Sequence, residues 1–255
     1  MVEIKTAGEL DAMREAGRIV GRALQEVVKH AAVGVRLAEL DEVAAAVIAE
    51  AGATPAFLHY HPSFAPTPYP KVICASVNDV IVHGIPGRSR LRDGDLVSID
   101  CGAYLDGWAG DSAVSFTVGM PRARDVELIS VTEQALQAGI AAMTPGNRIG
   151  DIGHAIAQHA VAGGYGVMVD FGGHGIGRRM HEDPHVANYG RAGRGMVLRA
   201  GMTLAIEPMF VAGGDGAYQV DRDGWALRSV DGTRAAHVEH SVAVTDDGPR
   251  ILTLP

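Results

Sequence analysis

The sequence predicts a mixed α/β (α+β) fold in which two similar halves form one domain. In each half, two segments with helical spacing of apolar residues precede segments with strand character. A stretch of the first half, residues 91–100, recurs in the second as residues 198–207, at an offset of 107 residues. A chain of 255 residues suits one domain or two small ones. We therefore expect a single domain over residues 1–255, with halves of about 1–120 and 121–255.

The repeat has a second part upstream, where residues 33–37 resemble residues 145–149 at an offset of 112. The offset is smaller for the downstream segments, so the first half must contain additional residues between its two segments. A proline-rich loop could supply them. In both copies of the longer segment the strand ends on a carboxylate, Asp100 in the first and Glu207 in the second. The two echoes indicate an internal duplication.

Four helices are predicted from the spacing of apolar side chains. Thr6 and Glu9 form a capping box at the start of the first helix. Gly52 ends the second helix, and Pro145 separates the third from the fourth. The predicted helices cover residues 6–30, 37–51, 126–143 and 149–162.

Strands are predicted where short apolar and β-branched runs lie between turn residues. Residues 59–70 contain four prolines and therefore form an irregular loop. A hairpin that turns near Asp106 places Asp100 opposite Asp111 or Ser112. The predicted strands cover residues 72–77, 80–81, 96–99, 112–118, 202–206, 218–220, 225–230 and 237–245.

Composition excludes several classes of protein. The formal net charge of −8 argues against a dedicated nucleic-acid binder, because phosphate neutralisation needs a basic face. The two cysteines, Cys74 and Cys101, cannot form a disulfide framework or a four-cysteine zinc site. There is no signal-peptide pattern and no apolar run of membrane-spanning length. These features predict a cytoplasmic protein.

Two aspartates on neighbouring strands indicate a first element of chemistry. Side chains of paired strands lie about 4.5–5.5 Å apart, so Asp100 and Asp111 would repel each other unless a proton or cation lies between them. Asp is also a poor strand former. The alternative is a pair of solvated acids beside a turn.

Three residues of the second half favour the cation. His174 lies among glycines, and Glu207 and Glu239 interrupt apolar strands, where a lone buried carboxylate is costly. Four carboxylates with one imidazole suit two divalent cations about 3.5–4 Å apart that share a water. Such a pair lowers the pKa of the water and polarises a carbonyl group, which is hydrolytic chemistry. Oxygen-rich ligation favours Mn, Fe(II), Co or Mg-like ions over a metal that prefers thiolates.

Other catalytic schemes lack their residues. The sequence has no G-x-S-x-G nucleophile elbow and no phosphate-binding P-loop. Cys74 and Cys101 are more readily interpreted as small buried hydrophobic residues than as nucleophiles.

In their order and spacing, these motifs resemble the type I methionine aminopeptidase family. The resemblance covers essentially the whole chain and rests on residues 77–86, 99–100, 110–111, 173–177, 181–184, 206–209 and 238–241. It implies the pita-bread (creatinase/aminopeptidase) fold, with two pseudo-symmetric halves around a sheet rich in antiparallel strands. It also implies a metal-dependent aminopeptidase that removes the initiator methionine of nascent chains when the second residue is small, by attack of a metal-activated water on the peptide carbonyl.

The family resemblance assigns roles residue by residue. One metal would be held by Asp100, Asp111 and Glu239, and the other by Asp111, His174, Glu207 and Glu239; the two ions would be Co, Mn, Fe(II) or Zn. The catalytic residues would be His83, His181 and Glu207, with Glu207 as proton shuttle. Substrate would contact His83, His181, Tyr69, Cys74 and Trp225. From the residues alone, the two histidines could equally be surface residues, and Trp225 could simply pack in a hairpin.

The chain departs from the family pattern at two places. Met180 stands where the family usually has Phe, so one pocket wall could differ. The loop of residues 59–70 carries additional residues, including His59 and His61. It is either an ordinary surface loop or a changed pocket rim.

Two other functions remain open at this point. The proline-specific branch of the same fold shares the five ligands, although its members usually carry a further N-terminal domain for which 255 residues leave no room. A metal-free module that captures peptide N-termini is the second alternative.

Partners follow from the same interpretation. We expect a monomer that meets nascent N-termini, with no membrane partner and no sequence-specific nucleic acid. A transient ribosome contact would use arginines that otherwise form a solvated face: Arg178, Arg179, Arg191, Arg194 and Arg199.

Overall fold

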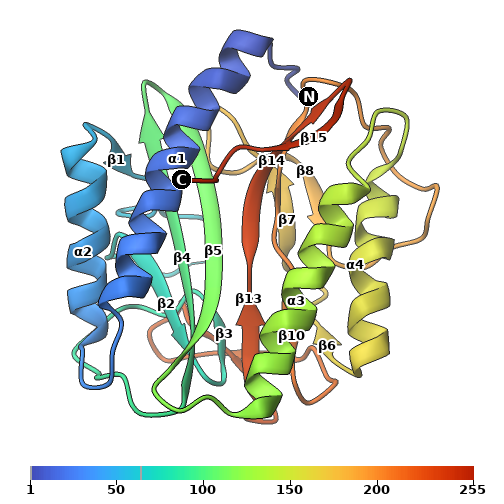
Figure 1. Ribbon diagram of the computed structural model, residues 1–255. Helices are drawn as coiled ribbons and strands as arrows, with labels where there is room; N and C mark the ends of the chain where they lie inside the picture. The colour runs from blue at the N-terminus through green and yellow to red at the C-terminus, as the bar shows by residue number, and fades with distance from the viewer. Residues whose placement is uncertain (1, 64) are drawn as a thin grey trace.

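The architecture is a curved antiparallel main sheet with helices against one face (Figure 1), accompanied by two three-stranded sheets. The computed structural model describes residues 2–63 and 65–255, and within them the main sheet has nine strands. Its order is β1-β4-β5-β14-β9-β7-β8, with β2 paired to β4 and β15 paired to β14. The sheet therefore joins strands of both halves, which meet where β5 pairs with β14.

The first half follows the predicted order of helix, helix, strands. Thr6 caps the first helix and exchanges hydrogen bonds with Glu9, as the capping box predicts. Gly52 follows the second helix with φ +70°. The elements are α1 Ala7–His30, α2 Leu37–Glu50, β1 Thr54–Pro55, β2 Ile73–Val77, β3 Val80–Val82, β4 Asp95–Leu105 and β5 Trp108–Val118.

The second half repeats this order with more numerous, shorter strands. Its two helices match the prediction to within a few residues. The elements are α3 Ala123–Ala141, α4 Ile149–Gly163, β6 Gly166–Val167, β7 Gly172–Gly175, β8 Glu182–Ala187, β9 Thr203–Ile206, β10 Met209–Val211, β11 Tyr218–Val220, β12 Leu227–Ser229, β13 Ala235–His237, β14 Glu239–Thr245 and β15 Gly248–Ile251.

The duplication predicted from sequence recurs in the backbone contacts. Each of three contacts in one half has a counterpart in the other at the offsets of 112 and 107 residues found in the sequence. The bridge Arg36↔Arg90 corresponds to Arg148↔Val197, the hydrogen bond from Gly34 N to Leu91 O to that from Gly146 N to Leu198 O, and the bond from Leu37 N to Ser89 O to that from Ile149 N to Met196 O.

The register of the β4–β5 hairpin differs from the prediction. Asp100 lies opposite Ala113, and Asp111 lies opposite Gly102. The prediction that Asp100 faces position 111 or 112 was wrong, because the turn consists of Asp106 and Gly107, both with positive φ. Asp100 and Asp111 are instead diagonal neighbours on one face of the sheet, still within reach of each other.

Two strand predictions also need correction. The single strand predicted for residues 237–245 is interrupted at Val238 and forms β13 and β14, which belong to different sheets. Strand β7 was not predicted, because glycines disfavour strands. Its glycines allow close approach: a Cβ on Gly173 would lie 2.1 Å from the Ala205 carbonyl oxygen.

Each half has its own hydrophobic core between its helices and the sheet. One core includes Val20 and Leu40 of the first two helices, and the other includes Leu136 and Ile156 of the next two. In the part of the chain that the structure describes, no helix combines the length and apolar character needed to cross a membrane.

Helix α1 approaches the C-terminal segment closely enough to depend on glycine, which yields a stability prediction. A Cβ on Gly17 would lie 2.3 Å from the Leu252 carbonyl oxygen, whereas one on Gly8 of the same helix would meet nothing within 4 Å. We expect Gly17→Ala to lower the free energy of unfolding by about 1–3 kcal/mol through overpacking. The control Gly8→Ala should be neutral or gain up to about 1 kcal/mol. Urea unfolding measures both, and equal values would contradict this packing.

Candidate active site

A cavity of about 440 Å³ opens beside the seam between the two halves. Seventeen residues line it, and all ten site residues predicted from the sequence are among them. These ten are Tyr69, Cys74, His83, Asp100, Asp111, His174, His181, Glu207, Trp225 and Glu239. Residues far apart in the chain, such as Asp100 and Glu239, thus meet in one place.

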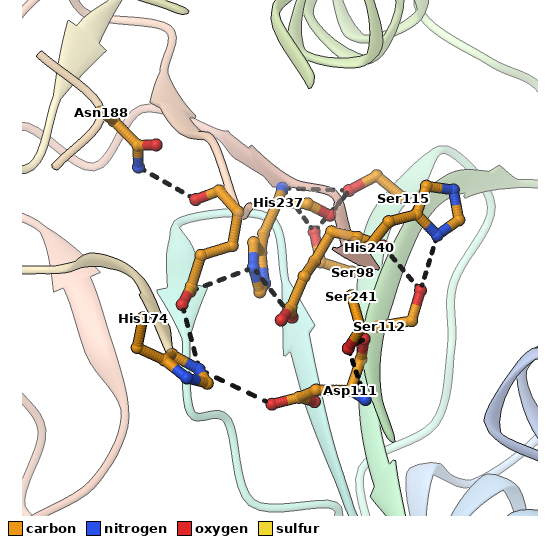
Figure 2. Close-up of polar contacts among 11 residues, drawn as sticks. Ser98, Asp111, Ser112, Ser115, His174, Asn188, His237, His240 and Ser241 are labelled. Atoms are coloured by element: carbon orange, nitrogen blue, oxygen red, sulfur yellow. Dashed lines mark hydrogen bonds and ion pairs between the residues drawn. The ribbon is translucent and has the colours of Figure 1, made fainter. Parts of the chain in front are cut away.

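The sheet positions the acidic residues through its central strands. Asp111 lies on β5, and its backbone N–H donates to the Ser241 hydroxyl of β14 at 3.0 Å. Between the same two strands, the Ser112 hydroxyl of β5 donates to the Glu239 backbone carbonyl oxygen of β14 at 2.6 Å. These two serines fix β5 against β14, so the Asp111 and Glu239 side chains are held by rigid backbone (Figure 2).

His174 is oriented as a metal ligand. Its Nδ1 lies 2.9 Å from the Gly175 carbonyl oxygen, which can only accept a hydrogen bond. Nδ1 therefore carries the proton, and Nε2 keeps a lone pair. That Nε2 lies 3.8 Å from Asp111 Oδ2 and 3.6 Å from Glu207 Oε1. A second ring, His181, lies 4.3 Å from His174 between ring centroids.

Sequence reasoning missed His237, which belongs to the same cluster. Its side chain is 2% exposed, and its Nε2 lies 3.6 Å from Glu207 Oε2 and 3.9 Å from Glu239 Oε2. A signal was present: His237 and Glu239 are two residues apart, the spacing that places strand residues on one face. His237 itself does not line the cavity; the unpredicted residues that do are Phe57, Tyr60, Asp170, Phe171, Gly172, His185 and Tyr218.

Burial and mutual repulsion disfavour ionisation of the acids. Burial raises the pKa of Asp100 and of Glu207 to about 7. Burial, reinforced by the Asp100 carboxylate, raises the pKa of Asp111 well above its ordinary value. For Glu239, burial again comes first and the Asp111 carboxylate second, and both raise the pKa. Without a counter-charge, four anions cannot be accommodated at this point.

The donor set fits divalent cations. Among the described residues, three buried carboxylate oxygens have no hydrogen-bond partner: Asp100 Oδ1, Asp111 Oδ1 and Glu239 Oε1. Unpaired buried acceptors of this kind are rare in proteins unless an ion or water satisfies them. Two groups have ligand atoms close enough to share an ion, namely Asp111 with His174 and Glu239, and Glu207 with His237 and Glu239. Oxygen and imidazole donors suit Mn, Fe, Co or Zn.

The remaining wall of the cavity is aromatic. The Tyr69 hydroxyl lies 3.0 Å from the carbonyl oxygens of both Ile73 and Gly84, so its proton is engaged by the backbone. The Tyr69 ring meets Trp225 edge-on at 4.9 Å between centroids. Burial raises the pKa of the Cys74 thiol, which keeps it protonated and apolar. The wall therefore presents an apolar surface close to the carboxylates.

Two departures from the family pattern can now be located. Met180 is buried among the aromatic residues but does not line the cavity. The loop of residues 59–70 does contribute to the rim, since Tyr60 stacks on His181 and Trp225 Nε1 donates to the Thr67 carbonyl oxygen. His59 and His61 are exposed and do not line the cavity. Phe64 of this loop lies outside the described residues.

The five arginines singled out in the sequence are exposed. Arg178 lies over the Trp108 ring, 3.9 Å from its centroid, and its Nη2 is 3.9 Å from Glu9 Oε1. This arginine therefore has a role within the fold.

Comparisons with known proteins agree with the site. The model of metallopeptidase family M24 matches residues 11–246. Methionine aminopeptidase 1 of Mycobacterium tuberculosis is 52% identical, covering 100% of this chain and 96% of that protein. The crystal structure of methionine aminopeptidase from Thermotoga maritima matches with a TM-score of 0.95 at 41% identity, over 100% of both chains.

A more distant structure shows the fold alone. Prolidase from Pyrococcus furiosus matches with a TM-score of 0.77 at 22% identity, over 99% of this chain and 65% of that chain. The predicted pita-bread fold and the family resemblance are thereby confirmed. The chain belongs to metallopeptidase family M24.

Proposed function

We propose that this protein is a methionine aminopeptidase that removes the initiator methionine from nascent chains when the second residue is small. One observation carries the proposal: buried carboxylates and an imidazole converge at one side of a cavity whose other side is apolar and aromatic. Relatives that match over the whole chain bear this name.

We assign two divalent cations to the converging donors. Asp100, Asp111 and Glu239 would hold one ion, and Asp111, His174, Glu207 and Glu239 would hold the other. When bound, divalent cations supply Lewis acidity and lower the pKa of water.

Glu207 is the residue best placed to move a proton. It lies between the imidazoles of His174 and His237, each 3.6 Å from one of its two oxygens. In this role its carboxylate takes a proton from the attacking water and delivers it to the departing amine. The backbone at Glu207 is held in place, since Asn188 Nδ2 donates to the Glu207 backbone carbonyl oxygen at 2.9 Å.

The two substrate histidines act as neutral donors. Burial lowers the pKa of His83 to about 4, so its ring is uncharged at neutral pH. His181 is exposed at the cavity mouth, where Tyr60 stacks on it at 5.0 Å between ring centroids. We assign to His181 the N–H that stabilises negative charge developing on the substrate carbonyl oxygen.

The apolar wall would receive the methionine side chain. A thioether makes favourable contacts with aromatic rings, and Tyr69 and Trp225 offer theirs with their polar atoms already bonded to backbone. The protonated Cys74 thiol adds a polarisable, uncharged contact. This arrangement favours an unbranched apolar side chain over a charged one.

Cellular context stays a prediction. Both cysteines are free and buried, which suits the predicted reducing cytoplasm. The monomeric state and a transient ribosome contact through the exposed arginines also remain predictions.

Substrate choice tests the proposal against the proline-specific alternative. We expect Met-Ala-Ser to be hydrolysed and Xaa-Pro dipeptides to be left intact by the metal-loaded enzyme. Met-Leu-Ser should be cleaved far more slowly than Met-Ala-Ser, because the second residue must be small. Preferential cleavage of Xaa-Pro would replace the proposal, and a protein that retains no metal after incubation with it and shows no peptidase activity would support the metal-free binding module.

Removal of a single carboxylate tests the metal assignment. We expect Asp111→Asn or Glu239→Gln to lower the turnover of Met-Ala-Ser by more than about 100-fold, since losing only an outer partner of a metal ligand already costs about 10–100-fold. Circular dichroism should show an intact fold. Asp106→Asn in the same hairpin is the control, because it is exposed and Asn tolerates its positive φ. Near-normal turnover in the ligand variants would contradict the two-metal assignment.

Metal removal should destabilise the protein in a pH-dependent way. Folded-state pKa values near 7 for Asp100 and Glu207, against 3.8 and 4.5 for the free side chains, mean that the metal-free fold binds extra protons between these values. Its stability therefore falls as pH rises from about 4 to about 7. Bound cations offset this loss, so the gain in Tm on adding Mn²⁺ should be larger at pH 8 than at pH 5.

The size of this gain follows from mass action. At a metal concentration of 100 times Kd the stabilisation is about 2.7 kcal/mol, or about 5–10 °C for a chain of this length. The gain is the difference between the Tm measured with metal and the Tm measured with chelator at the same pH. Groups away from the site titrate alike in both samples, so their contributions cancel. A gain that is independent of pH would show that the carboxylates do not titrate in this range.

A further inference from the structure

We propose that His237 is an additional metal ligand, so that this centre has two imidazole donors. The inference rests on the proposed metal site and extends the ligand set that the family resemblance supplies. His237 is 2% exposed, and its Nε2 is a buried atom without a hydrogen-bond partner among the described residues. An unsatisfied, buried imidazole nitrogen beside carboxylates requires an explanation.

The distances around His237 match those around His174. His237 Nε2 lies 3.6 Å from Glu207 Oε2 and 3.9 Å from Glu239 Oε2. His174 Nε2 lies 3.6 Å from Glu207 Oε1 and 3.8 Å from Asp111 Oδ2. A charged hydrogen bond would bring these atoms to about 2.7–2.9 Å. Two donors that each lie about 2.0–2.2 Å from one ion are instead separated by roughly 3–4 Å.

The internal duplication places His237 where the first half has a ligand. In the first hairpin Gly102 lies opposite Asp111, and at the offset of 107 residues its counterpart, Met209, lies opposite His237. Asp100 and Glu207 precede Gly102 and Met209 by two residues each. His237 is therefore arranged relative to Glu207 as Asp111 is arranged relative to Asp100.

The orientation of the His237 side chain agrees with a role as a metal ligand. Figure 2 shows the His174 and His237 rings directed toward a common space that Asp111 borders from below. The donor atoms of Glu207, His237 and Glu239 all lie within 4.8 Å of one another. A divalent cation of the Mn, Co or Zn class between Glu207 and Glu239 would satisfy the His237 nitrogen.

X-ray absorption on the cobalt-loaded protein tests the proposal, because a coordinated imidazole produces a characteristic outer-shell scattering that an uncoordinated one does not. The decisive variant is His174→Gln, which removes the other imidazole ligand. We expect imidazole scattering to persist in it at about half the wild-type amplitude. His237→Gln should show the same halving, and the double variant should show none. The control His185→Gln, at a different histidine of the cavity wall, should match the wild type.

The outcomes separate this inference from the proposed function. If His174→Gln binds cobalt but shows no imidazole scattering, His237 is not a ligand and the inference fails, while the five-ligand centre stands. If calorimetry shows no Co²⁺ binding to the chelator-treated wild type, the metal site itself fails. The spectrum of His174→Gln decides the first outcome and calorimetry on the wild type decides the second, so neither depends on His237→Gln folding.

Discussion

The structure is organised around the mutual repulsion of four buried carboxylates. Asp100, Asp111, Glu207 and Glu239 come from different parts of the chain, and a folded protein can bring them together only at an electrostatic cost. The seam between β5 and β14 nevertheless fixes two of them rigidly, through the hydroxyls of Ser112 and Ser241. Rigid backbone that enforces this repulsion is the arrangement expected of a preorganised cation site, because the ion then binds without reorganising its ligands.

The duplicated fold explains how such a centre is built. Each half contributes antiparallel strands that carry or end at a carboxylate, β4 and β5 from the first and β9 and β14 from the second, and these strands are joined side by side in one sheet. The donors thus lie on adjacent strands, where strand spacing alone sets their separation. The apolar wall comes from elsewhere: from the proline-rich loop, which supplies Tyr69, and from the segment that carries Trp225.

Much of this could be predicted from the sequence, for identifiable physical reasons. The four helices have long apolar periodicities and, at Thr6, a capping box, so their limits were found to within a few residues. The acids of the site were recognisable because Asp and Glu are costly inside apolar strands. Short strands such as β6 and β10 have too few residues to show a period. Strand β7 consists largely of glycine, which permits close approach to Ala205 but has low strand propensity.

The wrong partner predicted for Asp100 has a different origin, which is that local pattern does not fix register. A turn centred one residue away changes which side chains oppose each other, and this displaced Asp111 from its predicted partner. The break at Val238 could not be seen either, because both sides of it have strand character. The two-residue spacing of His237 and Glu239, which places both side chains on one side of a strand, is the signal by which His237 could have been found.

The position of β14 in the sheet has a consequence for how the protein is made. This strand lies between β5 and β9, yet both of those strands precede it in the chain. Until β14 has been synthesised and inserted, the strands of the two halves are therefore not hydrogen-bonded to each other in this sheet. Contacts between residues so distant in sequence form slowly, because loop closure is costly. Glu239 opens that strand, so in a chain that is still being synthesised the four carboxylates come together only after the central strand has been inserted.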